Sequence, residues 1–330
     1  MIQKIAFAFL LAAFAFSSAK ATGTNIPENT VIPIAGSGYT ENAKNKSMQL
    51  VYKGKRIPYS TFALFAMPGE SMKFSVNGTG LHHIKMHDGG EILQINSNTY
   101  IMNAPEEHGV YRVQINSNDY TESIDLNVVV MIPKTEVKNG WLNGYRIGSY
   151  PGTPLNNNPA YLPPEGFIEL TPENFNLRVS PHFTLGQFMC KQEGDFPKYI
   201  VLQERLIIEL EEILETLNNR GYRANTLTIM SGYRTPYYNA RIGNCRYSRH
   251  QWGDAADIFL DTRSPHGWMD DLNGDGVVDV KDAMILKEIV EKLRGSTTDR
   301  PRVGGIGLYD ARPWRGPFIH VDLRGNRARW

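Results

Sequence analysis

The sequence predicts a two-domain protein in which an all-β sandwich of immunoglobulin-like type precedes an α+β domain. Three observations support this prediction. Residues 25–132 alternate apolar and polar side chains, residues 133–166 are rich in proline, glycine and asparagine, and a helical period appears after residue 200. At 330 residues the chain is long enough for two domains of ordinary size.

Residues 1–21 are typical of a secretory signal peptide. Lys4 supplies a positive start, an apolar run covers residues 5–16, and Ala19-Lys20-Ala21 has the small residues of a cleavage site. The run is short for a membrane span, and no later stretch reaches the length of a transmembrane helix. We therefore expect an exported, soluble protein that begins near residue 22.

The charge balance argues against two classes of partner, although local charged patches remain possible. The chain has 35 basic and 34 acidic residues, a formal net charge of +1. A nearly neutral protein has no overall field that would attract nucleic acid or an anionic membrane. We expect neither as a partner.

The β-sandwich is predicted over residues 22–132. Alternation is clearest at residues 72–76, 111–115 and 124–130, and turn pairs such as Asn77-Gly78 separate the runs. Several short strands divided by turns, with no helical period, favour a sandwich. Its partner is unknown from sequence, and a spacer or a partner-binding module is the default hypothesis.

Residues 133–166 are predicted to form a linker or an extended arm. Proline and glycine interrupt any regular pattern there. The segment nevertheless carries four large aromatic residues, which indicate that it packs against a domain: Trp141, Tyr145, Tyr150 and Tyr161.

The α+β domain is predicted over residues 167–330. Its clearest helix has an apolar stripe made of Leu202, Leu206, Leu210, Ile213, Leu214 and Leu217. The acids of this helix are interpreted as a solvated face: Glu204, Glu209, Glu211, Glu212 and Glu215. A strand is expected at residues 226–230, directly before Ser231-Gly232-Tyr233-Arg234.

One stretch carries a metal-ligand pattern. His250 and Asp257 lie seven positions apart around small residues, and His320 follows on a later strand as His320-Val321-Asp322. Two imidazoles and one carboxylate form a three-ligand zinc set that leaves a fourth position for water. The alternative is a surface histidine beside a turn aspartate.

These residues resemble a known family. The pattern S-x-H-x-x-G-x-A-x-D, followed by H-x-D, is similar to the D-alanyl-D-alanine carboxypeptidase family of zinc peptidases (the M15 group), especially its periplasmic murein peptidase branch. Three further stretches match in the same order: residues 183–188, 231–239 and 304–309. The resemblance covers about residues 167–330. It implies an α+β fold with a small antiparallel sheet and helices, Zn²⁺ as cofactor, peptidoglycan peptides as substrate and a periplasmic location.

The resemblance also suggests roles for individual residues. Arg234 would bind a substrate carboxylate through its planar fork of donors, with Tyr233 and Ser248 beside it. The competing interpretation of Arg234 is a structural arginine that pairs with an acid of its own domain. Asp254 is a further site candidate, although an exposed or capping role is expected for it.

The general base is where the sequence departs from the family. Relatives place Glu three residues, or His two residues, before the last histidine ligand, and here Pro317 and Phe318 occupy these positions. Two assignments of His320 and Asp322 are therefore possible. Either His320 is the ligand and Asp322 supports the water as a catalytic group, or His320 is catalytic and Asp322 is the third ligand. We favour the first, and a non-catalytic zinc-binding or peptidoglycan-binding protein remains the alternative function.

A second metal site is predicted at residues 271–282. Oxygen-bearing groups stand at positions 1, 3, 5, 7, 9 and 12 of a calcium loop of EF-hand type, with glycine at position 6: Asp271, Asn273, Asp275, Val277 through its carbonyl, Asp279 and Asp282. Aspartate at the last position makes the loop similar to those of dockerins. A scaffold role would need a second repeat, which the sequence lacks, so a structural Ca²⁺ clip is expected. A metal-free acidic turn is the alternative.

The two cysteines, Cys190 and Cys245, allow one intramolecular pair. In an oxidising compartment they could form a disulfide that braces the site. Free thiols are the equal alternative.

Overall fold

The computed structural model describes residues 47–78, 82–88, 90–262, 266–296 and 303–330. The predicted signal peptide lies outside these ranges. Within them, no helix has the length and apolar character that a membrane crossing requires.

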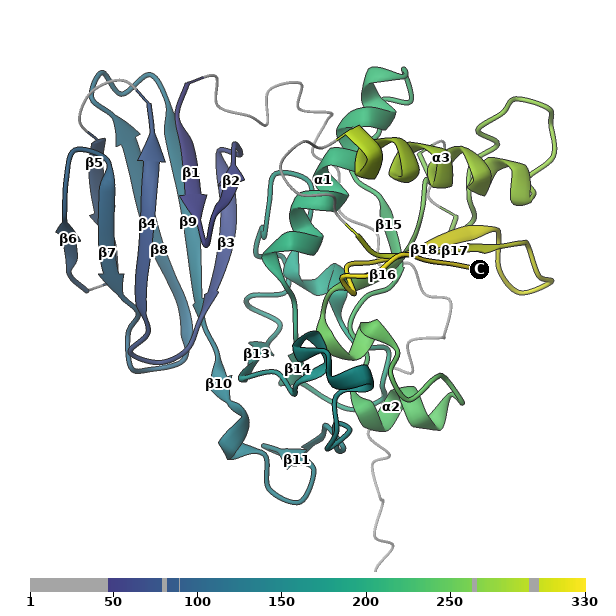
Figure 1. The fold of residues 1–330 in the computed structure, drawn as a ribbon, viewed down its shortest axis with the longest axis horizontal. Helices are drawn as coiled ribbons and strands as arrows, with labels where there is room; N and C mark the ends of the chain where they lie inside the picture. Colours follow the sequence, from purple (N-terminus) through teal and green to yellow (C-terminus); the bar gives the residue numbers. More distant parts are fainter. Residues whose placement is uncertain (1–46, 79–81, 89, 263–265, 297–302) are drawn as a thin grey trace, which may run out of the picture.

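The first domain consists of two β-sheets that lie face to face (Figure 1). Its five-stranded sheet has the order β2 (Lys55–Ile57), β1 (Gln49–Tyr52), β4 (Ser71–Asn77), β7 (Thr99–Asn103) and β6 (Ile92–Gln94). Its four-stranded sheet has the order β3 (Thr61–Ala66), β9 (Ser123–Val130), β8 (Gly109–Ser117) and β5 (His82–Met86). The alternation at residues 72–76 becomes alternating burial in β4, because successive side chains point to opposite faces.

The arm is tied to the second domain at several points. β10 (Ile132–Pro133) pairs with β13 (Gly166–Leu170), and β13 pairs with β14 (Lys198–Ile200). Between them lie a hairpin of β11 (Trp141–Leu142) and β12 (Tyr145–Arg146) and the short 3-10 helices η1 (Lys134–Glu136), η2 (Leu155–Asn157) and η3 (Pro159–Tyr161). Tyr145 and Tyr161 are buried.

The second domain is built on a five-stranded sheet. Its order is β15 (Thr228–Ser231), β16 (Ala255–Phe259), β18 (Phe318–Asp322), β17 (Gly305–Tyr309) and β19 (Ala328–Arg329). All neighbours are antiparallel except β17 and β19. The helices α1 (Glu204–Asn219) and α3 (Val280–Ser296) lie together on one side of this sheet, while α2 (Pro236–Arg241) lies on the other (Figure 1). The mixed sheet with few helices fits an α+β peptidase domain.

Two acids of α1, Glu209 and Glu211, do not lie on the solvated face that the sequence suggested, whereas Glu215 is exposed there. Glu209 and Glu211 are 1% and 2% exposed. Glu209 accepts a hydrogen bond from Nε of Arg294 at 2.7 Å, and Glu211 lies 2.7 Å from Nδ1 of His182. The periodicity predicted the helix, but it could not show that α3 and the segment before η4 (Leu185–Phe188) cover both sides of it.

The two domains share direct contacts. The backbone N–H of Ala63 donates to the Val179 carbonyl at 2.9 Å, and the N–H of Phe65 donates to the Glu204 carboxylate at 3.2 Å. Buried apolar residues of both domains form one continuous core. The first domain is therefore packed directly against the second domain, in addition to being connected to it through residues 133–166.

The disulfide alternative is not formed. Both cysteines are free thiols, with Cys190 buried and Cys245 exposed. The Cys190 side chain lies in the core, where burial raises the pKa of its thiol.

Candidate metal centre

Three side chains from distant parts of the sequence converge on one point. Nε2 of His250 lies 3.2 Å from Oδ1 of Asp257, Nδ1 of His320 lies 2.8 Å from the same oxygen, and the two imidazole nitrogens are 3.1 Å apart. Ligands of a tetrahedral zinc at ~2.05 Å stand about 3.3 Å from one another, so this triangle fits the ion. In the described part of the chain, this is the one convergent group of at least three His, Cys, Asp or Glu side chains.

Two strands and one 3-10 helix position these ligands. Asp257 on β16 is paired directly with His320 on β18, so both side chains leave the same face of the sheet. His250 belongs to η5 (Arg249–Trp252), which ends at Gly253 in the left-handed conformation with φ of 68°. A Cβ at residue 253 would lie 2.3 Å from the Val201 carbonyl oxygen, so only glycine brings η5 this close to the core.

A backbone carbonyl fixes the orientation of His250. The Gly232 oxygen lies 2.7 Å from Nδ1, which places the ring proton on Nδ1 and leaves the lone pair of Nε2 for a metal. Burial, aided by the positive charge of Arg234, lowers the pKa of His250 to about 4. The imidazole is therefore neutral, as a ligand must be, at physiological pH.

The Asp322 carboxylate fixes the orientation of the His320 ring. Its Oδ2 lies 3.0 Å from Nε2 of His320, on the side of the ring away from the other ligands, and its Oδ1 accepts the N–H of Gly305 at 3.0 Å. This is the carboxylate–histidine arrangement that orients metal ligands. The geometry therefore favours the register in which His320 is a ligand. It does not place Asp322 beside the water, as the predicted catalytic role requires.

Arg234 contacts a metal ligand. Its Nη2 donates to Oδ2 of Asp257 at 2.6 Å, and its Nε donates to Oγ of Ser231 at 2.8 Å. Burial alone would raise the pKa of Asp257, but His250 and Arg234 lower it well below its usual range. This pairing with an acid of its own domain agrees with the structural alternative for Arg234, and its substrate-binding role stays a prediction.

The burial of Tyr233 does not fit its predicted substrate role, while the role of Ser248 stays a prediction. Tyr233 is 2% exposed, and its hydroxyl lies 3.0 Å from that of Tyr150. It is a core residue that ties the arm to the site. Ser248 stands directly before η5, and its carbonyl accepts the N–H of Gln251 at 3.1 Å. This contact helps to shape the turn that carries His250.

Asp254 is buried, not exposed or capping. It is 0% exposed and accepts a hydrogen bond from Nε of Arg249 at 2.9 Å, with Arg205 as a second ion-pair partner. Its own carbonyl accepts the N–H of Leu323. Asp254 therefore joins η5 to the end of β18, a role that no local sequence signal reveals.

The predicted calcium loop has its own internal order. Asp282 is buried and accepts N–H groups of Leu272 and Asn273 at 2.8 and 3.1 Å, while Asp271 accepts those of Gly274 and Gly276. The Lys281 ammonium lies 3.2 Å from Asp275 and 3.3 Å from Asp279. The acids of the loop thus accept hydrogen bonds from backbone N–H groups or pair with Lys281. No three of them converge on one point. The structure does not support a Ca²⁺ site here, so that site stays a prediction.

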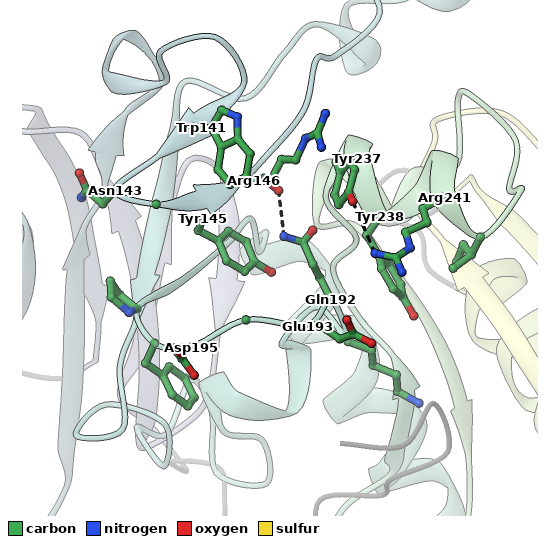
Figure 2. A pocket seen from close by; sticks show the side chains of 16 residues that line it. Trp141, Asn143, Tyr145, Arg146, Gln192, Glu193, Asp195, Tyr237, Tyr238 and Arg241 are labelled. Atoms are coloured by element: carbon green, nitrogen blue, oxygen red, sulfur yellow. Dashed lines mark hydrogen bonds between the residues drawn. The ribbon is translucent and has the colours of Figure 1, made fainter. Parts of the chain in front are cut away.

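A separate pocket of about 1050 Å³ opens between the β11–β12 hairpin, the segment after Cys190 and α2 (Figure 2). Figure 2 shows Trp141, Arg146 and Tyr237 on one side of it and Glu193 and Asp195 on another. The Arg146 guanidinium lies between the two aromatic rings, 5.4 and 4.2 Å from their centres. None of the three metal-ligand residues lines this pocket.

A buried His-Asp-His set on an α+β sheet could hold a metal ion, and such a set suits a mononuclear zinc hydrolase. Comparison with known families points to a particular class: the model of the family Peptidase M15 matches residues 181–268. The match includes His250 and Asp257 and ends before His320. It supports a peptidase of the M15 family, whose members are zinc metallopeptidases.

Two other comparisons add little. No curated protein sequence matches the chain. Among solved structures, the crystal structure of the titin M3 domain is 18% identical, with 26% of this chain and 98% of that chain covered and a TM-score of 0.18. At this TM-score the likeness establishes no shared fold, and the immunoglobulin-like class of the first domain stays a prediction.

Proposed function

We propose that this protein is a zinc metallopeptidase that hydrolyses peptide bonds in the stem peptides or crosslinks of peptidoglycan. The convergence of His250, Asp257 and His320, each with a second partner that fixes its orientation, is the observation that carries this proposal. The family match over residues 181–268 supports the peptidase class, and the substrate follows from the motif resemblance.

The residues around the ligands each have a task. When bound, zinc would polarise a carbonyl and lower the pKa of a water molecule. Gly232 and Asp322 hold the imidazole protons on the far nitrogens, so both lone pairs face the ion. Arg234 occupies one oxygen of Asp257 and leaves the other free. All three ligand residues are buried.

A missing proton acceptor keeps the non-catalytic alternative open. Pro317 and Phe318 occupy the positions where relatives carry a base, and neither can accept a proton. A zinc-binding protein that only attaches to peptidoglycan would share every feature of the metal centre. Activity is therefore the decisive measurement.

The test is digestion of crosslinked peptidoglycan by the zinc-loaded protein, with released fragments identified by mass spectrometry. We expect new fragments from the wild type and none from His250→Ala. A wild type that holds one zinc per chain and releases nothing from any wall preparation would establish the binding alternative.

We further propose, from residue spacing alone, that the loop of residues 271–282 binds Ca²⁺ as a structural clip. Binding would require Lys281 to leave Asp275 and Asp279. We expect EGTA to lower the melting temperature of the protein and added Ca²⁺ to restore it. An unchanged melting temperature would leave the acidic-turn alternative.

The proposal has three further parts. Residues 1–21 act as a signal peptide for export, the protein is periplasmic, and the sandwich domain binds a partner. These follow from the sequence pattern and the resemblance. Detection of a mature N-terminus near residue 22 in a periplasmic extract would test the first two.

A further inference from the structure

The pocket of about 1050 Å³ beside α2 has three walls that are tied to one another. They are the β11–β12 hairpin, the segment of residues 191–197 and helix α2 (Figure 2). The buried Gln192 side chain joins all three walls. Its Nε2 donates to the Arg146 carbonyl at 3.0 Å, and its Oε1 accepts the hydroxyl of Thr235, the N-cap of α2, at 2.6 Å. The cavity is therefore largely pre-formed, as ligand pockets usually are.

A close backbone approach holds the hairpin side against α2. The N–H of Tyr237 donates to the Ile147 carbonyl at 3.0 Å, and a Cβ at Gly148 would lie 2.6 Å from the same nitrogen. Gly148 also has φ of 83°, which favours glycine. This approach brings aromatic residues of the arm and of α2 to one cavity.

Aromatic rings from all three walls line the pocket: Trp141, Tyr145, Phe196, Tyr237 and Tyr238. Trp141 and Phe196 are 46% and 39% exposed, so part of each ring is free to contact a ligand. The Arg146 guanidinium lies 5.4 and 4.2 Å from the ring centres of Trp141 and Tyr237 and holds both rings in place.

Both signs of charge line the pocket. Arg146 and Arg241 come from the hairpin and α2, while Glu193 and Asp195 come from the segment of residues 191–197, which also supplies Lys191. Among the ion pairs between described residues, none involves either arginine or either acid of this pocket. A polyanion would meet the two carboxylates, and a polycation would meet the guanidinium groups. A hydroxyl group both donates and accepts hydrogen bonds, so it can satisfy both kinds of side chain.

We propose that this pocket binds a saccharide, namely the glycan part of peptidoglycan. A sugar ring has apolar C–H faces that pack on aromatic rings. Its hydroxyl groups donate to carboxylates and accept from guanidinium N–H groups. The pocket has both kinds of partner, and its volume is at the upper end of the range for small-ligand pockets, about 300–1,000 Å³, so a short oligosaccharide fits. The choice of wall glycan as the saccharide rests on the proposed function.

The position of the pocket fits a ligand that is joined to the substrate peptide. Arg234, whose guanidinium contacts Asp257 at the metal centre, stands three positions before Tyr237 of the pocket wall. Three residues span at most about 11 Å, and an extended peptide advances about 3.3–3.6 Å per residue. A glycan strand bound in the pocket can therefore hold the start of a stem peptide within a few residues of the metal centre.

The test measures binding of a sugar that carries no peptide. The protein is titrated calorimetrically with N-acetylchitotetraose, and separately with the peptide N-acetyl-L-lysyl-D-alanyl-D-alanine. We expect the wild type to bind the tetrasaccharide with or without zinc, because no metal-ligand residue lines the pocket. Trp141→Ala should weaken this binding roughly 10-fold, because it removes one aromatic wall. Glu193→Gln should weaken it roughly 5-fold, because a neutral acceptor replaces a charged one.

Each variant has a matched control. Trp314 is 64% exposed and does not line the pocket, so Trp314→Ala should leave the saccharide affinity unchanged. Glu136 is an exposed acid of the arm outside the pocket, so Glu136→Gln should also have no effect. Melting temperatures and zinc affinities of all four variants check that the fold and the metal centre are intact.

The outcomes separate this inference from the proposed function. No binding of the tetrasaccharide by the wild type, or equal affinities of the wild type and Trp141→Ala, would overturn the saccharide site even if peptides are cleaved. Peptide binding that Trp141→Ala weakens, without saccharide binding, would assign the pocket to peptides and overturn it as well. Saccharide binding that depends on Trp141 and Glu193, without cleavage of any wall preparation, would support the site and count against the peptidase.

Discussion

Asp322 orients one candidate metal ligand and is not itself one of the three converging residues. It holds the far nitrogen of His320, and Gly305 and Arg324 hold it in turn. The strand alternation of His320-Val321-Asp322 predicted that both side chains share a face. It could not distinguish a ligand or base from an orienting residue, because that depends on which ring nitrogen faces the neighbouring strand.

Asp322→Asn tests this orienting role. The amide can donate to Nε2 of His320 and so favour the wrong tautomer, with the proton on the metal side. We expect zinc affinity to fall about 10- to 100-fold, as measured by competition with a chromophoric chelator. Asp310→Asn, at an exposed position of the β17–β18 loop, is the control. Unchanged zinc affinity together with lost activity would instead indicate a catalytic base.

The three candidate metal ligands could be named from the sequence because their pattern is largely local, and the structure brings them together. His250 and Asp257 stand at fixed spacing around Gly253, and His320 begins a recognisable H-x-D pair. The pairing of Arg234 with Asp257 could only be offered as an alternative, since the partner of a guanidinium is set by tertiary structure. The sequence did not predict that the ring of Trp330 lies 5.3 Å from that of His320, because the pairing of β19 with β17 brings the two together.

At the scale of single elements, the turn after η5 sets the position of His250. Gly253 has φ of 68°, and a Cβ there would meet the Val201 carbonyl, whereas Gly221 has φ of 93° with nothing within 4 Å. Both glycines adopt a backbone that other residues rarely accept, but only Gly253 is also in close contact. A pair of alanine variants therefore separates the two effects.

Gly253→Ala should lower the free energy of unfolding more than Gly221→Ala does. Gly221→Ala carries only the backbone strain, about 1–3 kcal/mol. Gly253→Ala adds a steric clash that pushes η5 outward, so zinc affinity should fall as well. Chemical denaturation and zinc titration of both variants measure this. Equal losses of stability, with zinc binding intact, would contradict the role given to the close approach.

Helix α1 illustrates what periodicity reveals and what it hides. The apolar stripe predicted the helix and its buried face, and Leu206, Leu210 and Leu214 are fully buried. The burial of Glu209 and Glu211 depends on Arg294 and His182, which lie 85 and 29 residues away in the sequence. Ion pairs between residues so far apart do not appear in the periodic pattern of the sequence.

Glu209→Leu should destabilise the second domain. The change leaves the Arg294 guanidinium buried without its carboxylate, and breaking a buried pair in this way costs about 3–5 kcal/mol. Glu215→Leu, at an exposed position of the same helix, should change stability far less. Thermal and urea unfolding of the two variants give the comparison. Similar small effects would show that water reaches Arg294 when its partner is removed.

For the whole molecule, the order of a β-rich part, an arm and a mixed α and β part was visible in the sequence. Alternation and turn residues are local signals, and strands β4, β8 and β9 lie where the alternation is clearest. The arrangement of these strands into sheets was not predictable, because β3 pairs in parallel with β9 across more than sixty residues. The contact between the domains was also hidden, since Ala63 and Phe65 meet Val179 and Glu204 only after both parts have folded.

Glu204 makes this contact sensitive to pH. Its carboxylate accepts the Phe65 N–H at the contact between the domains, and burial raises its pKa above the usual value of 4.5. The folded protein therefore binds this proton more tightly than the unfolded chain. Its contribution favours folding at low pH and is lost as pH rises from the unfolded pKa through the raised folded pKa.

Glu204→Gln removes this proton linkage and keeps an oxygen for the Phe65 N–H. We expect the variant to gain stability over the wild type as pH rises through that window and to be the more stable protein at neutral pH. Urea denaturation from acid to neutral pH, with the exposed Glu91→Gln as control, measures the difference. If the difference between variant and wild type does not change with pH, the Glu204 carboxylate is ionised in the folded protein over the whole range. Nearby Lys53 would then be the residue that compensates its burial.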